Sequence, residues 1–293
     1  MIRISCSDYT FPLLPRGQRF ALLKLLGFNY VDIGLFERTP DLMPTHLLAT
    51  PRTFIRKLQD DLRSAGMRAS DVFLQIGSDP SISAVNDPSQ EVISRNRRVF
   101  SLALDLCSTL GAKHLTGLPG VWHKPANQAD DFARAVEETT WRQDIAREAG
   151  VTYAVEAHIG SICSNIESTR ALLCAVPGLT LTLDYGHFVA EGISSQRIHP
   201  LLRFASHIHV RGGTPTQLQT PVSENRIDFP GMIRRLSQQR YTGFLAVEYA
   251  YTGWQQCNRT DNLSETILLR RQLEDHWTPR RSKARPTREV QHV

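Results

Sequence analysis

Short apolar runs alternate along the whole chain with longer segments of helical periodicity. The apolar runs predict strands at residues 2–6, 30–33, 69–75, 114–117, 152–157, 180–183, 207–210 and 243–247. Between them, the pattern predicts helices at residues 17–26, 53–65, 91–110, 128–149, 169–175, 230–239 and 263–277. A glycine, the residue that most often ends a helix, directly follows four of these helices, at Gly27, Gly66, Gly111 and Gly150.

This alternation of strand and helix predicts parallel strands with helices on the outside. Eight such units favour a closed barrel over a doubly wound sheet, and a barrel of this kind takes about 250 residues as one domain. No GxGxxG follows a strand and no GxxxxGK[ST] occurs, which argues against a nucleotide-binding fold. We therefore expect an α/β protein with a single (β/α)8 TIM barrel over residues 1–277.

The composition is that of an ordinary globular protein, with 41% hydrophobic and 22% charged residues. No run of 18 apolar residues is present, so no membrane-spanning helix is expected. The first 17 residues predict a strand and not a signal peptide. The five cysteines include no CxxC pair, and this odd number favours reduced thiols and a cytoplasmic location.

The net charge of +5 is concentrated at the end of the chain. Residues 278–293 carry five basic side chains against Glu289, which leaves the rest of the chain near neutrality. Two prolines and few apolar residues predict a flexible basic tail, and the lack of interleaved aromatic residues disfavours nucleic acid as a partner. Aromatic residues near the last helix, such as Trp277, are compatible with a homo-oligomer.

Four predicted strands end in residues that could bind a metal ion: Glu156, Asp184, His209 and Glu248. Each alone could be a helix cap or a salt-bridge partner. In a barrel, however, the carboxyl ends of the strands converge on one mouth. Three carboxylates there would repel one another unless a cation lay between them. Together with one imidazole they suit a divalent ion, with Mn²⁺ or Mg²⁺ favoured and Co²⁺ or Zn²⁺ compatible.

The HIH motif offers two candidate histidine ligands on one side of the same strand. His209 lies nearer the carboxyl end of the strand and is therefore the expected ligand. His207 is the alternative ligand, and it could equally be a histidine packed inside the barrel.

Several motifs, taken in order, resemble the sugar phosphate isomerase/epimerase superfamily, the xylose isomerase-like TIM barrels that include AP endonuclease family 2. They are GFNYVDIG, VEAH, LTLDYGHF, HIHVRGG and GFLAVEY, and the resemblance covers residues 2–275. It implies one divalent metal ion held by Glu156, Asp184, His209 and Glu248. It also implies that His187, in the DYGH motif, contacts substrate oxygens or orients the site.

The resemblance implies chemistry at a carbon next to a metal-polarised carbonyl. Glu156 and Glu248 would flank the substrate, one taking a proton and the other returning it through an enediolate. The expected function is thus a metal-dependent isomerase or epimerase of a sugar or sugar derivative. If a leaving group lies β to the carbonyl, the same enediolate predicts a lyase, such as a dehydratase or C-glycoside deglycosidase.

Other residues near the predicted mouth are candidate substrate contacts. His158 follows Glu156 by two residues, and Arg211 could pair with a substrate phosphate or with Asp184. Trp122 and His123 follow the fourth strand, where an aromatic ring could stack on a sugar or form part of a surface loop. Trp254 allows the same two interpretations, and Tyr9 and Phe11 could form an apolar wall.

The sequence departs from related enzymes at informative positions. Ketose 3-epimerases carry an arginine several residues beyond the metal histidine, where this chain has Thr214–Pro215 and Arg211 is the nearest basic residue. The carboxyl-terminal third resembles a branch grouped near enzymes of oxidised sugars and glycosides. A DNA-repair nuclease is disfavoured, because ligands for two of its three zinc ions are missing. A sugar-binding barrel without catalysis would not need the four predicted metal ligands.

Overall fold

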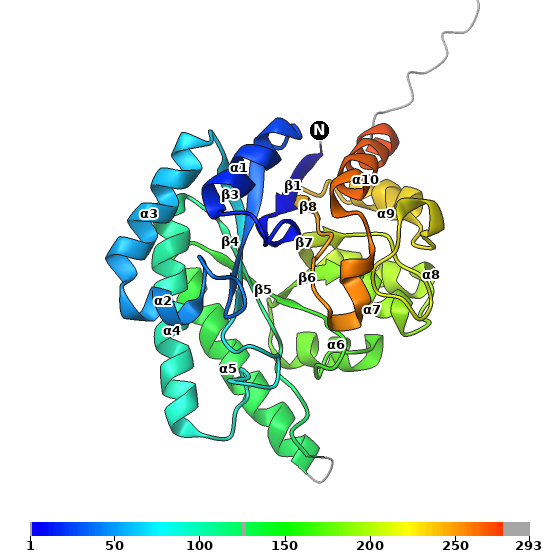
Figure 1. Ribbon diagram of the computed structural model, residues 1–293. Helices are drawn as coiled ribbons and strands as arrows, with labels where there is room; N and C mark the ends of the chain where they lie inside the picture. The colour runs from blue at the N-terminus through cyan, green and yellow to red at the C-terminus, as the bar shows by residue number, and fades with distance from the viewer. Residues whose placement is uncertain (1, 125–126, 278–293) are drawn as a thin grey trace, which may run out of the picture.

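Eight parallel strands close into a barrel in the computed structural model, which describes residues 2–124 and 127–277 (Figure 1). Neighbouring strands pair in sequence order, and the last strand closes the barrel against the first. The strands are β1 (Arg3–Ser7), β2 (Tyr30–Phe36), β3 (Arg68–Gln75), β4 (His114–Gly117), β5 (Thr152–Glu156), β6 (Thr180–Asp184), β7 (Ala205–Val210) and β8 (Phe244–Val247). The predicted TIM barrel is confirmed, whereas the predicted tail at residues 278–293 lies outside the described residues.

Helices surround this barrel (Figure 1). They are α1 (Arg16–Leu25), α2 (Pro44–Ala49), α3 (Pro51–Ser64), α4 (Gln90–Leu110), α5 (Gln128–Glu148), α6 (Ile166–Ala175), α7 (Tyr185–Ala190), α8 (Ser195–Ile198), α9 (Phe229–Gln238) and α10 (Asn262–Trp277). The short helices α2, α7 and α8 were not predicted, because each is too short to show a periodic pattern. The predicted helix ends are confirmed: Gly111, for example, caps α4 in the left-handed region with φ of 71°.

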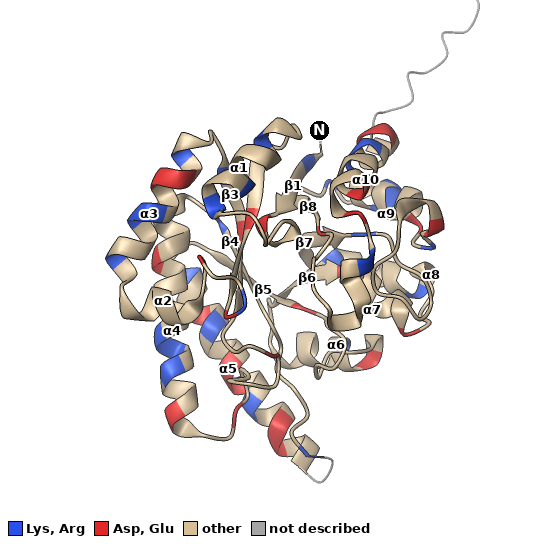
Figure 2. Ribbon diagram, in the orientation of Figure 1, with Lys and Arg blue, Asp and Glu red and all other residues tan. Residues whose placement is uncertain are grey.

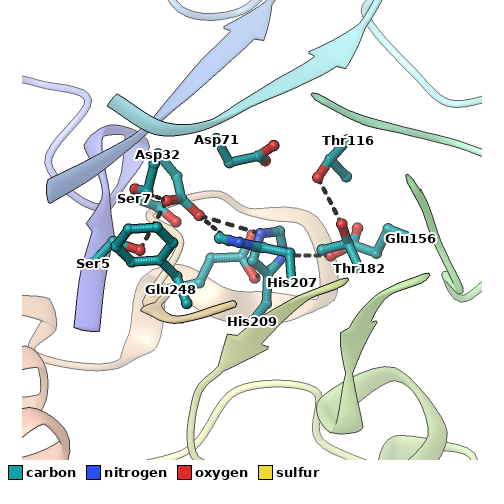
Figure 3. Close-up of polar contacts among 12 residues, drawn as sticks. Ser5, Ser7, Asp32, Asp71, Thr116, Glu156, Thr182, His207, His209 and Glu248 are labelled. Carbon is teal, nitrogen blue, oxygen red and sulfur yellow. Dashed lines mark hydrogen bonds and ion pairs between the residues drawn. The ribbon is translucent and has the colours of Figure 1, made fainter. Parts of the chain in front are cut away.

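The two faces of the strands differ in character. On β7, Ile208 and Val210 belong to the apolar core of the protein, whereas His207 and His209 alternate with them and point into the barrel (Figure 3). Most TIM barrels fill this interior with branched apolar side chains. Here the interior contains buried ionisable residues such as His207 and His209, so the site at the mouth continues into the barrel.

Three further features of the described residues bear on smaller predictions from the sequence. Outside the gap at 125–126, no helix between residues 2 and 277 has the length and hydropathy needed to cross a bilayer. All five cysteines are free, and only Cys174 is exposed. Trp277 is partly buried against the core at the end of α10.

Candidate functional site

A cavity of about 510 Å³ opens at the carboxyl-terminal mouth of the barrel. Parallel strands place their last residues at this end, and the cavity takes its polar lining from them. The polar and aromatic side chains that line it include Tyr9, Phe36, Phe73, Glu156, His158, His187, Arg211, Glu248 and Trp254. Seven of these nine residues were singled out from the sequence.

Three of the four predicted metal ligands form one compact group. His209 Nδ1 lies 2.6 Å from Glu156 Oε1 and 3.3 Å from Glu248 Oε2. Their ligand atoms all lie within 4.8 Å of one another, and the three side chains are buried. This group could hold a metal ion, since it offers two carboxylates and one imidazole nitrogen from three different strand ends.

The fourth predicted ligand, Asp184, has other partners in this structure. One carboxylate oxygen accepts from the Gly186 N–H at 2.6 Å and caps α7. The other accepts from Arg211 Nε at 2.8 Å and from Arg211 Nη2. The same Nη2 lies 2.5 Å from Glu248 Oε2. A buried guanidinium therefore neutralises two of the acidic side chains of the site.

His187 projects into the site with a ring nitrogen that has no hydrogen-bond partner. Its Nε2 is buried and lies 3.9 Å from Glu156 Oε2 and 3.7 Å from Asp184 Oδ2. Its Nδ1 accepts from the Ile159 N–H at 3.3 Å, which orients the ring. A buried polar atom of this kind is expected to acquire a partner when the site is filled.

An aromatic stack forms one wall beside these histidines. The Trp254 ring lies parallel to His158, with the centroids 5.0 Å apart. His158 Nδ1 in turn donates to the Ile159 carbonyl at 2.6 Å, so this nitrogen carries the ring proton. Both residues were expected near the mouth, and both line the cavity.

Tyr9 has a polar contact that the sequence did not predict. Its hydroxyl donates to Glu248 Oε1 at 2.8 Å, while its ring packs on Phe36 at 4.8 Å between centroids. Phe36 contacts Phe73, which lies 5.6 Å from the His209 ring. The predicted wall at Tyr9 is therefore aromatic, but it also fixes the orientation of Glu248.

Trp122 and His123 do not line this cavity. The Asp131 carboxylate accepts from the His123 N–H at 2.8 Å and contacts Nδ1 of its ring at 3.0 Å. Trp122, in the same loop, has an exposed side chain. The structure thus separates these two residues from the other predicted substrate contacts.

Burial and charge shift several pKa values at the mouth. Burial raises the pKa of Glu156 to about 7, and the neighbouring His209 only partly offsets it. Burial lowers the pKa of His158 to about 4 and that of His187 well below its usual value. Burial also acts to lower the pKa of His209, but Glu248 and Glu156 outweigh it and raise that pKa well above its usual value. Such shifts are typical of groups that move protons.

Beneath the mouth, a fully buried carboxylate connects the two histidines of β7 (Figure 3). Asp32 Oδ2 lies 2.6 Å from His207 Nε2 and 3.7 Å from His209 Nε2. Its other oxygen accepts from Ser5 at 2.9 Å and Ser70 at 2.6 Å. Asp32 therefore faces the ring nitrogen of His209 that points away from Glu156. The sequence signal was an acidic residue inside the apolar run YVDIG.

The fold and the mouth together define a TIM barrel with a buried carboxylate–histidine centre at the carboxyl ends of its strands. The family model of xylose isomerase-like TIM barrels matches residues 20–273, and the chain belongs to this family, as its motifs predicted. A comparison with curated protein sequences gives no match.

Solved structures of three enzymes share the fold. The D-allulose 3-epimerase from Methylomonas sp. is 16% identical, with a TM-score of 0.72 over 94% of this chain and 98% of that chain. The 3-keto-D-glucoside 4-epimerase from E. coli is 14% identical, with a TM-score of 0.69 over 94% and 100%. The probable 3-DHS dehydratase from Bacillus anthracis is 14% identical, with a TM-score of 0.66 over 92% and 99%.

Proposed function

We propose that this protein is a metal-dependent isomerase or epimerase of a sugar or sugar derivative. The observation that carries the proposal is the placement of Glu156 and Glu248 on either side of His209, facing one cavity at the mouth. Two carboxylates arranged around one reacting centre suit proton removal and proton return. The epimerases among the structural neighbours support this choice.

The donor set fits a divalent ion, with Mn²⁺ or Mg²⁺ as the proposed identity. Glu156, His209 and Glu248 would hold it, and the unpartnered His187 nitrogen faces the same space. Asp184 would join them when Arg211 releases its carboxylate. Such an ion, when bound, polarises a substrate carbonyl as a Lewis acid and so acidifies the neighbouring C–H bond.

The side chains of this chain then divide the remaining work. Glu156 is placed to take a proton from the substrate or to return it, because its buried carboxylate lines the cavity. Glu248 serves on the other side and is held in place by the Tyr9 hydroxyl. We assign substrate contact to His158, His187 and Arg211, because all three line the cavity. The aromatic wall excludes water from the reacting carbons.

Exchange of solvent deuterium tests this proposal. Protein loaded with Mn²⁺ is incubated in heavy water with a panel of ketoses and keto-glycosides, and label next to the carbonyl is followed by NMR. We expect exchange by the wild type and loss of at least a hundredfold of its rate in Glu156→Gln and in Glu248→Gln. Unchanged exchange in both variants would overturn the acid–base assignment.

The products separate the proposed reaction from its alternative. Recovery of an epimer or an isomer supports the proposal, whereas loss of water or of an aglycone identifies a lyase. We also propose a cytoplasmic location, which the five free cysteines support.

A further inference from the structure

A second cavity, of about 640 Å³, lies at the opposite pole of the barrel. It is formed where strands begin, by residues such as Tyr30 on β2, Ser70 on β3, His114 on β4 and Ser206 on β7. None of the proposed catalytic residues lines it. Its volume falls in the range of about 300–1,000 Å³ that is typical of small-molecule sites.

The charge of this cavity is one-sided. Its lining includes four cationic side chains, Arg3, Lys113, Arg203 and Arg240, and no aspartate or glutamate. Within residues 2–124 and 127–277, none of the four is found in an ion pair. Two of them lie over aromatic rings, with Arg3 4.2 Å from the Phe244 centroid, which directs a guanidinium without neutralising it.

The acidic residues nearest the cavity are covered by its floor. His114 Nδ1 lies 2.7 Å from Asp71, and its Nε2 lies 2.7 Å from Ser206 Oγ. His207 covers Asp32 in the same way, at 2.6 Å. Both carboxylates are fully buried and neither lines the cavity. The imidazole and hydroxyl groups of the floor therefore shield these carboxylates from the cavity, and the rim presents positive charge.

We propose that this pole of the barrel binds a small molecule that carries two or more phosphate groups. A concave surface with one sign of charge concentrates ions of the opposite sign. Guanidinium groups match phosphate oxygens in pairs and are the main groups that would hold such a ligand. The inference does not depend on the proposed reaction, because the two cavities share no lining residue.

Binding of inorganic pyrophosphate to the full chain, measured by calorimetry at low salt, tests the proposal. The test variant combines Lys113→Gln, Arg203→Gln and Arg240→Gln, all at exposed positions. Its matched control removes the same charge from α3, a helix that carries basic residues (Figure 2), through Arg52→Gln, Arg56→Gln and Lys57→Gln at exposed positions. We expect the test variant to bind at least tenfold more weakly and the control to bind within twofold of wild type.

Three results would overturn the proposal. Equal weakening in both variants would mean that pyrophosphate responds only to net charge. Absence of binding by the wild type would remove the site. Binding of a short single-stranded oligonucleotide at this pole, without binding of pyrophosphate, would make it a nucleic-acid surface instead. Weaker binding of citrate than of pyrophosphate supports the preference for phosphate.

Discussion

Replacement of Arg211 by methionine tests how the acidic mouth is neutralised. Arg211, Asp184 and Glu248 have side chains that are 4%, 1% and 5% exposed, so their charges are screened little by water. Methionine fills similar space without charge and leaves both carboxylates without their guanidinium. Removing one partner of a buried ion pair costs about 3–5 kcal/mol. At about 2–4 °C per kcal/mol for a chain near this size, Arg211→Met should unfold roughly 6–20 °C below wild type in EDTA.

A divalent ion should reverse much of this loss. It can occupy the space between Asp184 and Glu248 directly in the variant, whereas in the wild type it must first displace Arg211. An ion present at a hundred times its Kd stabilises by about 2.7 kcal/mol. We therefore expect Mn²⁺ to raise the unfolding temperature more in Arg211→Met than in wild type, measured by scanning calorimetry with and without EDTA.

A second buried arginine provides the control. Arg142, on α5, contacts Glu138 at 2.7 Å with both side chains 4% exposed, and neither residue lines the mouth cavity. Arg142→Met should also lower the unfolding temperature, but Mn²⁺ should not restore it. If Mn²⁺ stabilises Arg211→Met no more than it stabilises Arg142→Met, then Arg211 and the metal ion do not compete for the two carboxylates, and the reasoning is refuted.

Three further outcomes are expected. Asp32→Asn should lower Mn²⁺ affinity about 10–100-fold by calorimetry, because Asp32 faces His209 Nε2; Asp71→Asn, as control, should change it little. Neutral His158, with its pKa lowered from 6.5 to about 4, adds stability above pH 6.5 that is lost as the pH falls toward 4. The expected loss in the free energy of unfolding, measured with urea between pH 6.5 and 4, is about 3 kcal/mol. His158→Gln should make the free energy of unfolding depend less steeply on pH; an unchanged dependence would refute the burial argument. Cys174, the exposed thiol, should react with a thiol reagent in the native protein. The other four cysteines should react only in the unfolded protein, since burial raises the pKa values of their thiols. Fast reaction of a second thiol in the native state would contradict the described burial.

Local patterns in the sequence were sufficient to predict the barrel. Apolar runs of strand length, helical stretches and glycines such as Gly111 at helix ends act within a few residues of one another, so they can be read without the fold. The same reasoning predicted that Glu156, His209 and Glu248 would meet, because parallel strands bring their carboxyl ends to one mouth. It also predicted that the Cys residues would be free.

Contacts between distant strands were decided by the tertiary structure alone. Arg211 reaches Asp184 and Glu248, and Tyr9 reaches Glu248 across 239 positions of sequence, only after the barrel closes. The loop that holds Trp122 turns away from the cavity, which no local pattern indicates. Asp32 interrupts an apolar run, and its buried partner His207 lies on β7, three strands away around the barrel. The sequence determined which residues face inward, because side chains alternate between the two faces of a strand. Which of those inward residues touch one another was decided by the tertiary structure, because it depends on the stagger and closure of the eight strands.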